Sequence, residues 1–156
     1  MKKFNDNVIV SLNKFDNDFM TGWTERIDDS VVEKIINVSK KIKENSDCLV
    51  VIGIGGSFLG SYAVEEMLHP YFHRENDFEV IYAGTTLSSK YMNELLGYLE
   101  NKNFTVNVIS KSGTTMETSI TYKVLKDLLK RKYETLQDKI IVTTDEVKGT
   151  LRQEVN

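Results

Sequence analysis

The sequence predicts an α/β domain, built as a doubly wound parallel sheet with helices on both faces. Two observations support this fold class. Short apolar, β-branched runs alternate with longer segments whose apolar residues recur at helical spacing. Strands separated by helix-length segments are joined by right-handed crossovers, which make the strands parallel. No internal repeat or linker interrupts the alternation, so we expect a single core.

Composition narrows the classes of protein that fit this chain. Its 156 residues, 40% hydrophobic and 28% charged, suit one globular domain. The net charge of −3, without a long basic block, argues against nucleic acid as a main partner. No apolar run approaches the roughly 18 residues of a membrane span, and the amino terminus lacks the apolar stretch of a signal peptide. The single cysteine, Cys48, lies in an apolar run, which is typical of a reducing compartment. We therefore expect a cytoplasmic protein without a membrane partner.

The amino-terminal part shows little periodicity. We expect residues 1–29 to form an arm that lies on a domain of residues 30–156. From Ser30 onward apolar residues recur at helical spacing, and Ser30 with Glu33 matches a capping box. The domain is therefore expected to begin with a helix of three to four turns.

Four strands and three further helices are expected after this first helix. The strands are predicted at residues 48–54, 78–83, 104–109 and 140–143. Helical stripes of apolar residues lie between them, at residues 58–68, 91–99 and 116–129. Pro70 should end the first stripe, because proline lacks an N–H and restricts the residue before it. Residues 146–156 resemble the start of another helix.

A glycine-rich segment, Gly53-Ile54-Gly55-Gly56-Ser57, leaves the first strand. Ligands of parallel sheets collect at the carboxyl ends of strands, and glycines let backbone N–H groups approach an anion. The segment fits neither common nucleotide-binding motif. A dinucleotide fingerprint needs glycine where Phe58 stands, and a P-loop needs lysine after Gly60, where Ser61 stands. A tight turn without a ligand is the alternative interpretation.

A second loop, Ser110-Lys111-Ser112-Gly113-Thr114-Thr115, joins the third strand to the next helix. It combines four hydroxyls, one ammonium group and a helix amino terminus. A phosphate monoester needs several donors at once, and hydroxyls with backbone N–H groups supply them. We therefore predict one pocket for a small phosphorylated ligand, lined by both loops. Simple helix capping is the alternative, but it explains only one of the four hydroxyls.

Other candidate residues are weaker, and we expect no metal and no cofactor. His69 and His73 have the spacing of helical metal ligands, but Pro70 breaks that helix and a third ligand is not evident. Glu117 could act as a base in the turn after the loop of residues 110–115, which we call the hydroxyl loop. An acid at that position is also a favourable partner of the helix dipole.

Two segments, residues 51–60 and 108–117, resemble signatures of glucose-6-phosphate isomerases of the bacterial type. Thr143-Thr144-Asp145 with Gly149 and Leu151 is similar to the segment that comes after these signatures in that family. The resemblance covers residues from about 30 to the end, and it implies an SIS (sugar isomerase) domain. It also implies site residues: Ser110, Lys111, Ser112 and Thr115 would hold the sugar phosphate, Gly113 and Thr114 would shape the loop, and Gly56 and Ser57 would line the site.

The activity that the resemblance implies is the interconversion of glucose 6-phosphate and fructose 6-phosphate through an enediol, in glycolysis and gluconeogenesis. Family members are much longer than this chain and act as homodimers. Their catalytic base, ring-opening groups and stabilising arginine lie further toward the carboxyl end, so we expect no catalytic residue here. The chain is then expected to be an amino-terminal fragment that binds phosphate but is inactive alone.

Two other functions fit the same residues. One is a free-standing SIS module that senses a phosphosugar and regulates a partner protein, and the other is a structural domain without a ligand. A reading frame that continues past Asn156 into a second SIS domain would favour the enzyme, whereas a stop codon there would favour the sensor.

Overall fold

The computed structural model describes residues 26–68, 72 and 77–154. Most of the predicted arm lies outside the described residues, as do His69, Pro70 and His73. The chain divides into two compact units, residues 1–39 and 40–156. The whole sheet lies within the second unit.

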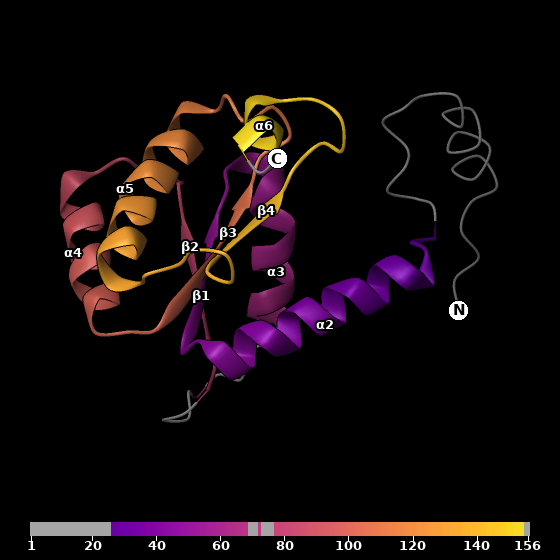
Figure 1. Ribbon diagram of the computed structural model, residues 1–156, viewed down its shortest axis with the longest axis horizontal. Coiled ribbons are helices and arrows are strands. Elements are labelled where there is room, and N and C mark those ends of the chain that lie inside the picture. Colours follow the sequence, from indigo (N-terminus) through magenta and orange to yellow (C-terminus); the bar gives the residue numbers. More distant parts are fainter. Residues whose placement is uncertain (1–25, 69–71, 73–76, 155–156) are drawn as a thin grey trace. The chain divides into compact units, whose positions relative to one another are not determined.

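Helices and strands alternate along the described residues as the sequence predicts (Figure 1). The helices are α2 (Asp29–Asn45), α3 (Leu59–Leu68), α4 (Ser89–Glu100), α5 (Met116–Lys132) and α6 (Thr150–Glu154), with a short 3-10 turn, η2 (Gly55–Ser57). The strands are β1 (Cys48–Ile52), β2 (Glu79–Ala83), β3 (Phe104–Ile109) and β4 (Ile140–Thr143). Strands β3 and β4 have the predicted bounds, whereas β1 ends two residues earlier than predicted.

The sheet confirms the predicted fold class. Its order is β2-β1-β3-β4 and every pairing is parallel. The first strand is therefore central, and the chain winds from it in both directions. Figure 1 shows α4 and α5 on one side of the sheet and α3 on the other. On the α3 side, the rings of Phe58 and Tyr62 each lie 5.2 Å from the ring of Tyr82 in β2.

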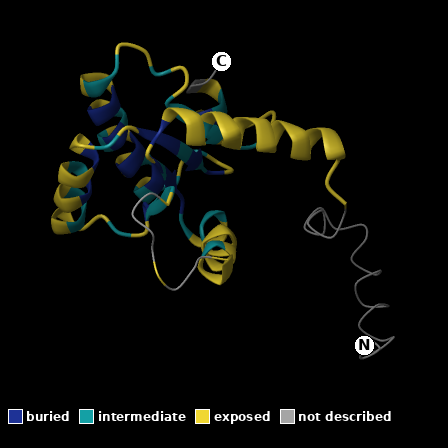
Figure 2. Cartoon of the chain, turned by 90° about the horizontal axis from the view of Figure 1, so that it is seen from below, coloured by how far each residue is buried: buried dark blue, intermediate teal, exposed yellow. Residues whose placement is uncertain are grey.

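The core lies between the sheet and the helices α4 and α5. Buried residues gather in the strands and on the inward faces of these two helices, as Figure 2 shows in dark blue. Alternate positions of β1 and β3 supply the sheet side, because successive side chains of a strand point to opposite faces. The buried side chains of the core are Cys48, Val50, Ile52, Ala83, Phe104, Val106 and Val108 from the strands, and Leu95, Leu99, Tyr122, Leu125, Leu128, Leu129 and Leu151 from the helices.

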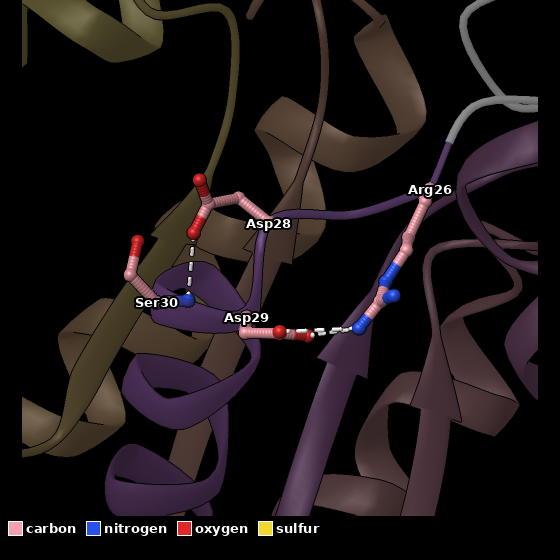
Figure 3. Close-up of polar contacts among 4 residues, drawn as sticks. All are labelled: Arg26, Asp28, Asp29 and Ser30. Carbon is pink, nitrogen blue, oxygen red and sulfur yellow. Dashed lines mark hydrogen bonds and ion pairs between the residues drawn. The ribbon is translucent and has the colours of Figure 1, made fainter.

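Asp28 caps the amino terminus of α2, which corrects the predicted capping box at Ser30. The backbone N–H of Ser30 donates to Asp28 Oδ1 at 2.7 Å (Figure 3). Ser30 is thus already inside the helix, and its side-chain and backbone hydrogen bonds hold the pKa of Asp28 below its usual range. Arg26 adds an ion pair to Asp29, with an N–O distance of 3.0 Å.

We expect Asp28→Ala to reduce the amide protection of Ser30 in hydrogen exchange, because its N–H group loses this acceptor. Asp28→Asn is the matched control, since asparagine caps equally well. Because the pKa of Asp28 is depressed, the cap is complete above the ordinary carboxyl pKa and is lost as pH falls through the depressed value. The asparagine variant should lack this acid sensitivity. Equal protection in all three proteins would contradict the assignment of Asp28 as the cap.

Cys48 is a buried thiol of the core, with 0% exposure. Burial, followed by the charge of Glu79, raises the pKa of this thiol from 9.0 to about 11. We therefore expect no reaction with thiol reagents at pH 8 in the folded chain and full reaction in denaturant. Because the raised pKa belongs to the folded state, its stability contribution is complete below pH 9 and lost as pH rises toward 11. The Cys48→Ala variant should not lose stability in this way as the pH rises. Equal alkaline destabilisation of both proteins would contradict the assignment of this loss to the thiol.

Candidate functional site

Three segments meet at the carboxyl edge of the sheet. They are the turn η2 after β1, the loop of residues 110–115 after β3, and residues 144–149 after β4. Strand register brings them together, because Ile52 pairs with Val108 and Ile109 pairs with Thr143. A cleft of about 580 Å³ lies between the segments. It is lined by Ile54, Ser57, Ile109, Ser110, Lys111, Ser112, Thr115, Thr118, Asp145, Lys148 and Gly149. The chain changes its winding direction between β1 and β3, which is where open α/β sheets bind ligands.

The loop of residues 110–115 is ordered by its own hydroxyl groups. Ser110 is buried, and its Oγ accepts the backbone N–H of Gly113 at 3.0 Å. Ser112 Oγ accepts both the N–H and the hydroxyl of Thr114, at 3.2 and 2.9 Å. In these contacts the two serine oxygens are acceptors, so each serine can still direct its hydroxyl proton at an anion.

Thr115 is the amino-terminal cap residue of α5, but its side chain makes no capping hydrogen bond. Simple helix capping therefore does not account for this hydroxyl. Thr115 instead lines the cleft at the end of α5, where the helix dipole favours negative charge.

The segment after β4 stabilises the hydroxyl loop through hydrogen bonds to its backbone carbonyls. Thr144 Oγ1 donates to the carbonyl of Ser110 at 2.7 Å, and the N–H of Thr150 donates to the carbonyl of Ser112 at 3.3 Å. Gly149 has φ +107°, and a Cβ there would lie 2.9 Å from the Ser112 carbonyl oxygen. Glycine at this position therefore permits the close approach of the two segments. No pattern in the sequence predicted these supporting contacts of Thr144 and Thr150.

Charges in the cleft favour an anion. Lys111 and Lys148 line it together with Asp145. Asp145 Oδ1 accepts the N–H groups of Val147 and Lys148, both at 2.9 Å. These bonds, with smaller contributions from the two lysines, hold the pKa of Asp145 below its usual range. Asp145 is therefore ionised at neutral pH, and the cleft carries two lysines against one carboxylate.

The structure brings most of the predicted site residues together, and it separates a few. Ser57, Ser110, Lys111, Ser112 and Thr115 line the cleft. Gly113 instead lines a smaller adjoining pocket of about 190 Å³, which shares Ser110 with the cleft. Gly56, Thr114 and the weaker candidate Glu117 line neither cavity.

Two features are absent from the described part of the chain. No group of three or more His, Cys, Asp or Glu residues there could hold a metal ion. Among residues 26–68, 72 and 77–154, no helix is both long and apolar enough to cross a bilayer.

Fold and cleft together define the class: a doubly wound α/β domain with a hydroxyl-rich cleft at the carboxyl edge of its sheet. A family model described as "Phosphoglucose isomerase" matches residues 6–149. The chain belongs to the phosphoglucose isomerase family.

Individual relatives agree with this assignment. The chain is 47% identical over 142 residues to curated glucose-6-phosphate isomerases of Staphylococcus aureus, among them those of strains Newman and N315. Each alignment covers 87% of this chain and 32% of the relative, so the chain spans about a third of the length of these curated relatives.

Two solved structures are similar to the chain. One is a hypothetical protein from Thermus thermophilus, with a TM-score of 0.73 and 27% identity over 96% of this chain and 35% of that one. The other is a glucose-6-phosphate isomerase from Chlamydia trachomatis, with a TM-score of 0.61 and 20% identity over 82% of this chain and 26% of that one. The second similarity shows the fold alone.

Proposed function

We propose that this chain is the sugar-phosphate-binding domain, of the SIS type, of a glucose-6-phosphate isomerase. The observation that carries the proposal is the cleft, which gathers the hydroxyls of Ser57, Ser110, Ser112 and Thr115 with the ammonium group of Lys111. The name of the curated relatives supports the choice of substrate. The full-length enzyme would interconvert glucose 6-phosphate and fructose 6-phosphate through an enediol, as a cytoplasmic homodimer in glycolysis and gluconeogenesis.

A phosphate dianion suits this cleft better than a neutral ligand. Its equivalent oxygens need several donors at once, and hydroxyls with the amino terminus of α5 supply them. Lys111 and Lys148 add attraction, while the ionised Asp145 gives the cleft an acceptor for sugar hydroxyl groups. The volume of about 580 Å³ lies within the range of small-molecule sites, which is roughly 300–1,000 Å³.

Proton transfer between C1 and C2 needs further groups. It requires a carboxylate base, an acid/base group for ring opening and a cation near the enediolate. Asp145 is a weak base, because two backbone N–H groups stabilise its charged form. Glu117 does not line the cleft. We therefore propose that the catalytic groups lie in the two thirds of the relatives' length that this chain does not span.

The proposal is tested by titrating the isotope-labelled chain with glucose 6-phosphate in an NMR experiment. The amide signals of Ser57 and of residues 110–115 should shift, and glucose without the phosphate should leave them unchanged. A coupled assay of the same protein should show no isomerase turnover. Absence of shifts would contradict phosphate binding, and turnover by the chain alone would contradict the assignment of catalysis to another part of the enzyme.

A further inference from the structure

We infer that Thr118 is a further ligand-binding residue of the cleft, and that its hydroxyl donates to a phosphate oxygen of the bound sugar phosphate. The inference rests on the proposed function and extends the site beyond the hydroxyl loop. Two independent observations support it: the burial of an unpaired hydroxyl, and its position between two cavities.

The first observation is the state of the Thr118 side chain. Thr118 is 3% exposed, and its Oγ1 has no hydrogen-bond partner among the described residues. A buried hydroxyl without a partner is unfavourable, and native proteins seldom keep one without a reason. Threonine in a helix commonly donates to the carbonyl four residues earlier, which here is that of Thr114. Thr118 makes no such bond, so its donor is unused; because Oγ1 is itself buried, a ligand would reach it through a shift of the side chain or of its neighbours.

The second observation is the place of Thr118 in the site. Thr118 lies in the first turn of α5, three residues after Thr115, and it lines both the cleft and the smaller pocket. Ser110 is the other residue that lines both cavities. An anion bound at the amino terminus of α5 would therefore have the hydroxyls of Ser110, Thr115 and Thr118 around it.

Thr121 provides an internal comparison, because the two threonines differ in one respect. Thr121 is also on α5, is 0% exposed and has an unpaired Oγ1. It lines neither cavity. Removing the hydroxyl of Thr121 thus reproduces the loss of a buried polar group without touching the cleft.

The test compares Thr118→Val with Thr121→Val and Thr118→Ser in the 156-residue chain. The measured quantity is the dissociation constant for glucose 6-phosphate and, separately, for inorganic phosphate. Because a hydrogen bond to a charged group is lost, Thr118→Val should weaken binding of both ligands about tenfold. Thr118→Ser should restore binding, and Thr121→Val should bind as the unchanged chain does. Weakening for glucose 6-phosphate alone would contradict a contact to phosphate.

A second measurement uses the unchanged chain, so it does not require any variant to fold. In the unchanged chain with labelled threonine methyl groups, inorganic phosphate should shift the methyl signal of Thr118 and leave that of Thr121 in place. If the loop amides shift but Thr118 stays still, or if Thr118→Val changes only thermal stability, Thr118 serves the interior of the domain and the inference is wrong. If the unchanged chain binds neither ligand, the proposed function is wrong as well.

Discussion

Gly113→Ala is expected to lower the free energy of unfolding by at least about 2 kcal/mol, and to weaken sugar-phosphate binding by more than about tenfold. Gly113 has φ +71°, a backbone conformation that other residues adopt with strain. A Cβ there would also lie 2.4 Å from the backbone N of Leu151 and 2.6 Å from Thr150 Oγ1. The loop and α6 would have to separate, and the cleft would lose its shape.

Denaturant unfolding and a glucose 6-phosphate titration measure these two effects. Gly97→Ala is the matched control, because Gly97 lies within α4 and a Cβ there would meet nothing within 4 Å. Alanine is the better helix former, so this control should raise stability by about 0.5–1 kcal/mol and leave binding unchanged. If Gly113→Ala behaved like Gly97→Ala, the close packing of the loop against α6 would be wrong.

Ser110→Ala is expected to weaken glucose 6-phosphate binding by about 10- to 100-fold, the range for hydrogen bonds to charged groups. Two losses combine at this residue. The hydroxyl donor to the phosphate disappears, and the N–H of Gly113 loses the acceptor that orders the loop. Thr115→Ala should have a smaller effect, because the Thr115 side chain makes no capping hydrogen bond that its loss could disturb.

Calorimetric titration with glucose 6-phosphate measures the affinities of the Ser110→Ala variant, the Thr115→Ala variant and the unchanged chain. Ser61→Ala is the control, since Ser61 is exposed, lies outside the cleft and donates only to the Phe58 carbonyl. Equal affinity of the Ser110→Ala variant and the unchanged chain would contradict the assignment of the hydroxyl loop to the phosphate site. A larger effect at Thr115 than at Ser110 would contradict the ordering role of the Ser110 hydroxyl.

Local sequence pattern was enough to predict the fold class and most element bounds. The strands β3 and β4 have the expected limits because charged or polar residues flank short apolar runs. The end of β1 differs because Gly53 and Ile54 continue the apolar run, although the chain already turns there toward η2. The α2 cap differs because Asp28 competes with Ser30, and a capping box does not decide between neighbouring acceptors. The boundary between arm and domain stays a prediction.

Residues of the candidate site were predictable only where they lie in one of two loops with a recognisable pattern, and Ser57 follows the glycines of the first loop. Ser110, Lys111, Ser112 and Thr115 stand together in the sequence, so their chemistry is visible without a structure. The contribution of Asp145 and the support from Thr144 depend on the register of β3 against β4, which joins residues more than thirty positions apart. Thr118 was missed because burial of its unpaired hydroxyl is a property of the packed helix.

The support of the hydroxyl loop by residues 144–151 also has a consequence for the order of folding. The contacts of Thr144 and Thr150 with the loop span 34 and 38 positions, so they require that the chain has returned from β3 through α5 to the end of β4. The hydrophobic core needs little from this last segment, since Leu151 is its one buried residue there. The cleft should therefore become competent after the core has condensed, and ligand affinity in a refolding experiment should lag behind the recovery of helical signal.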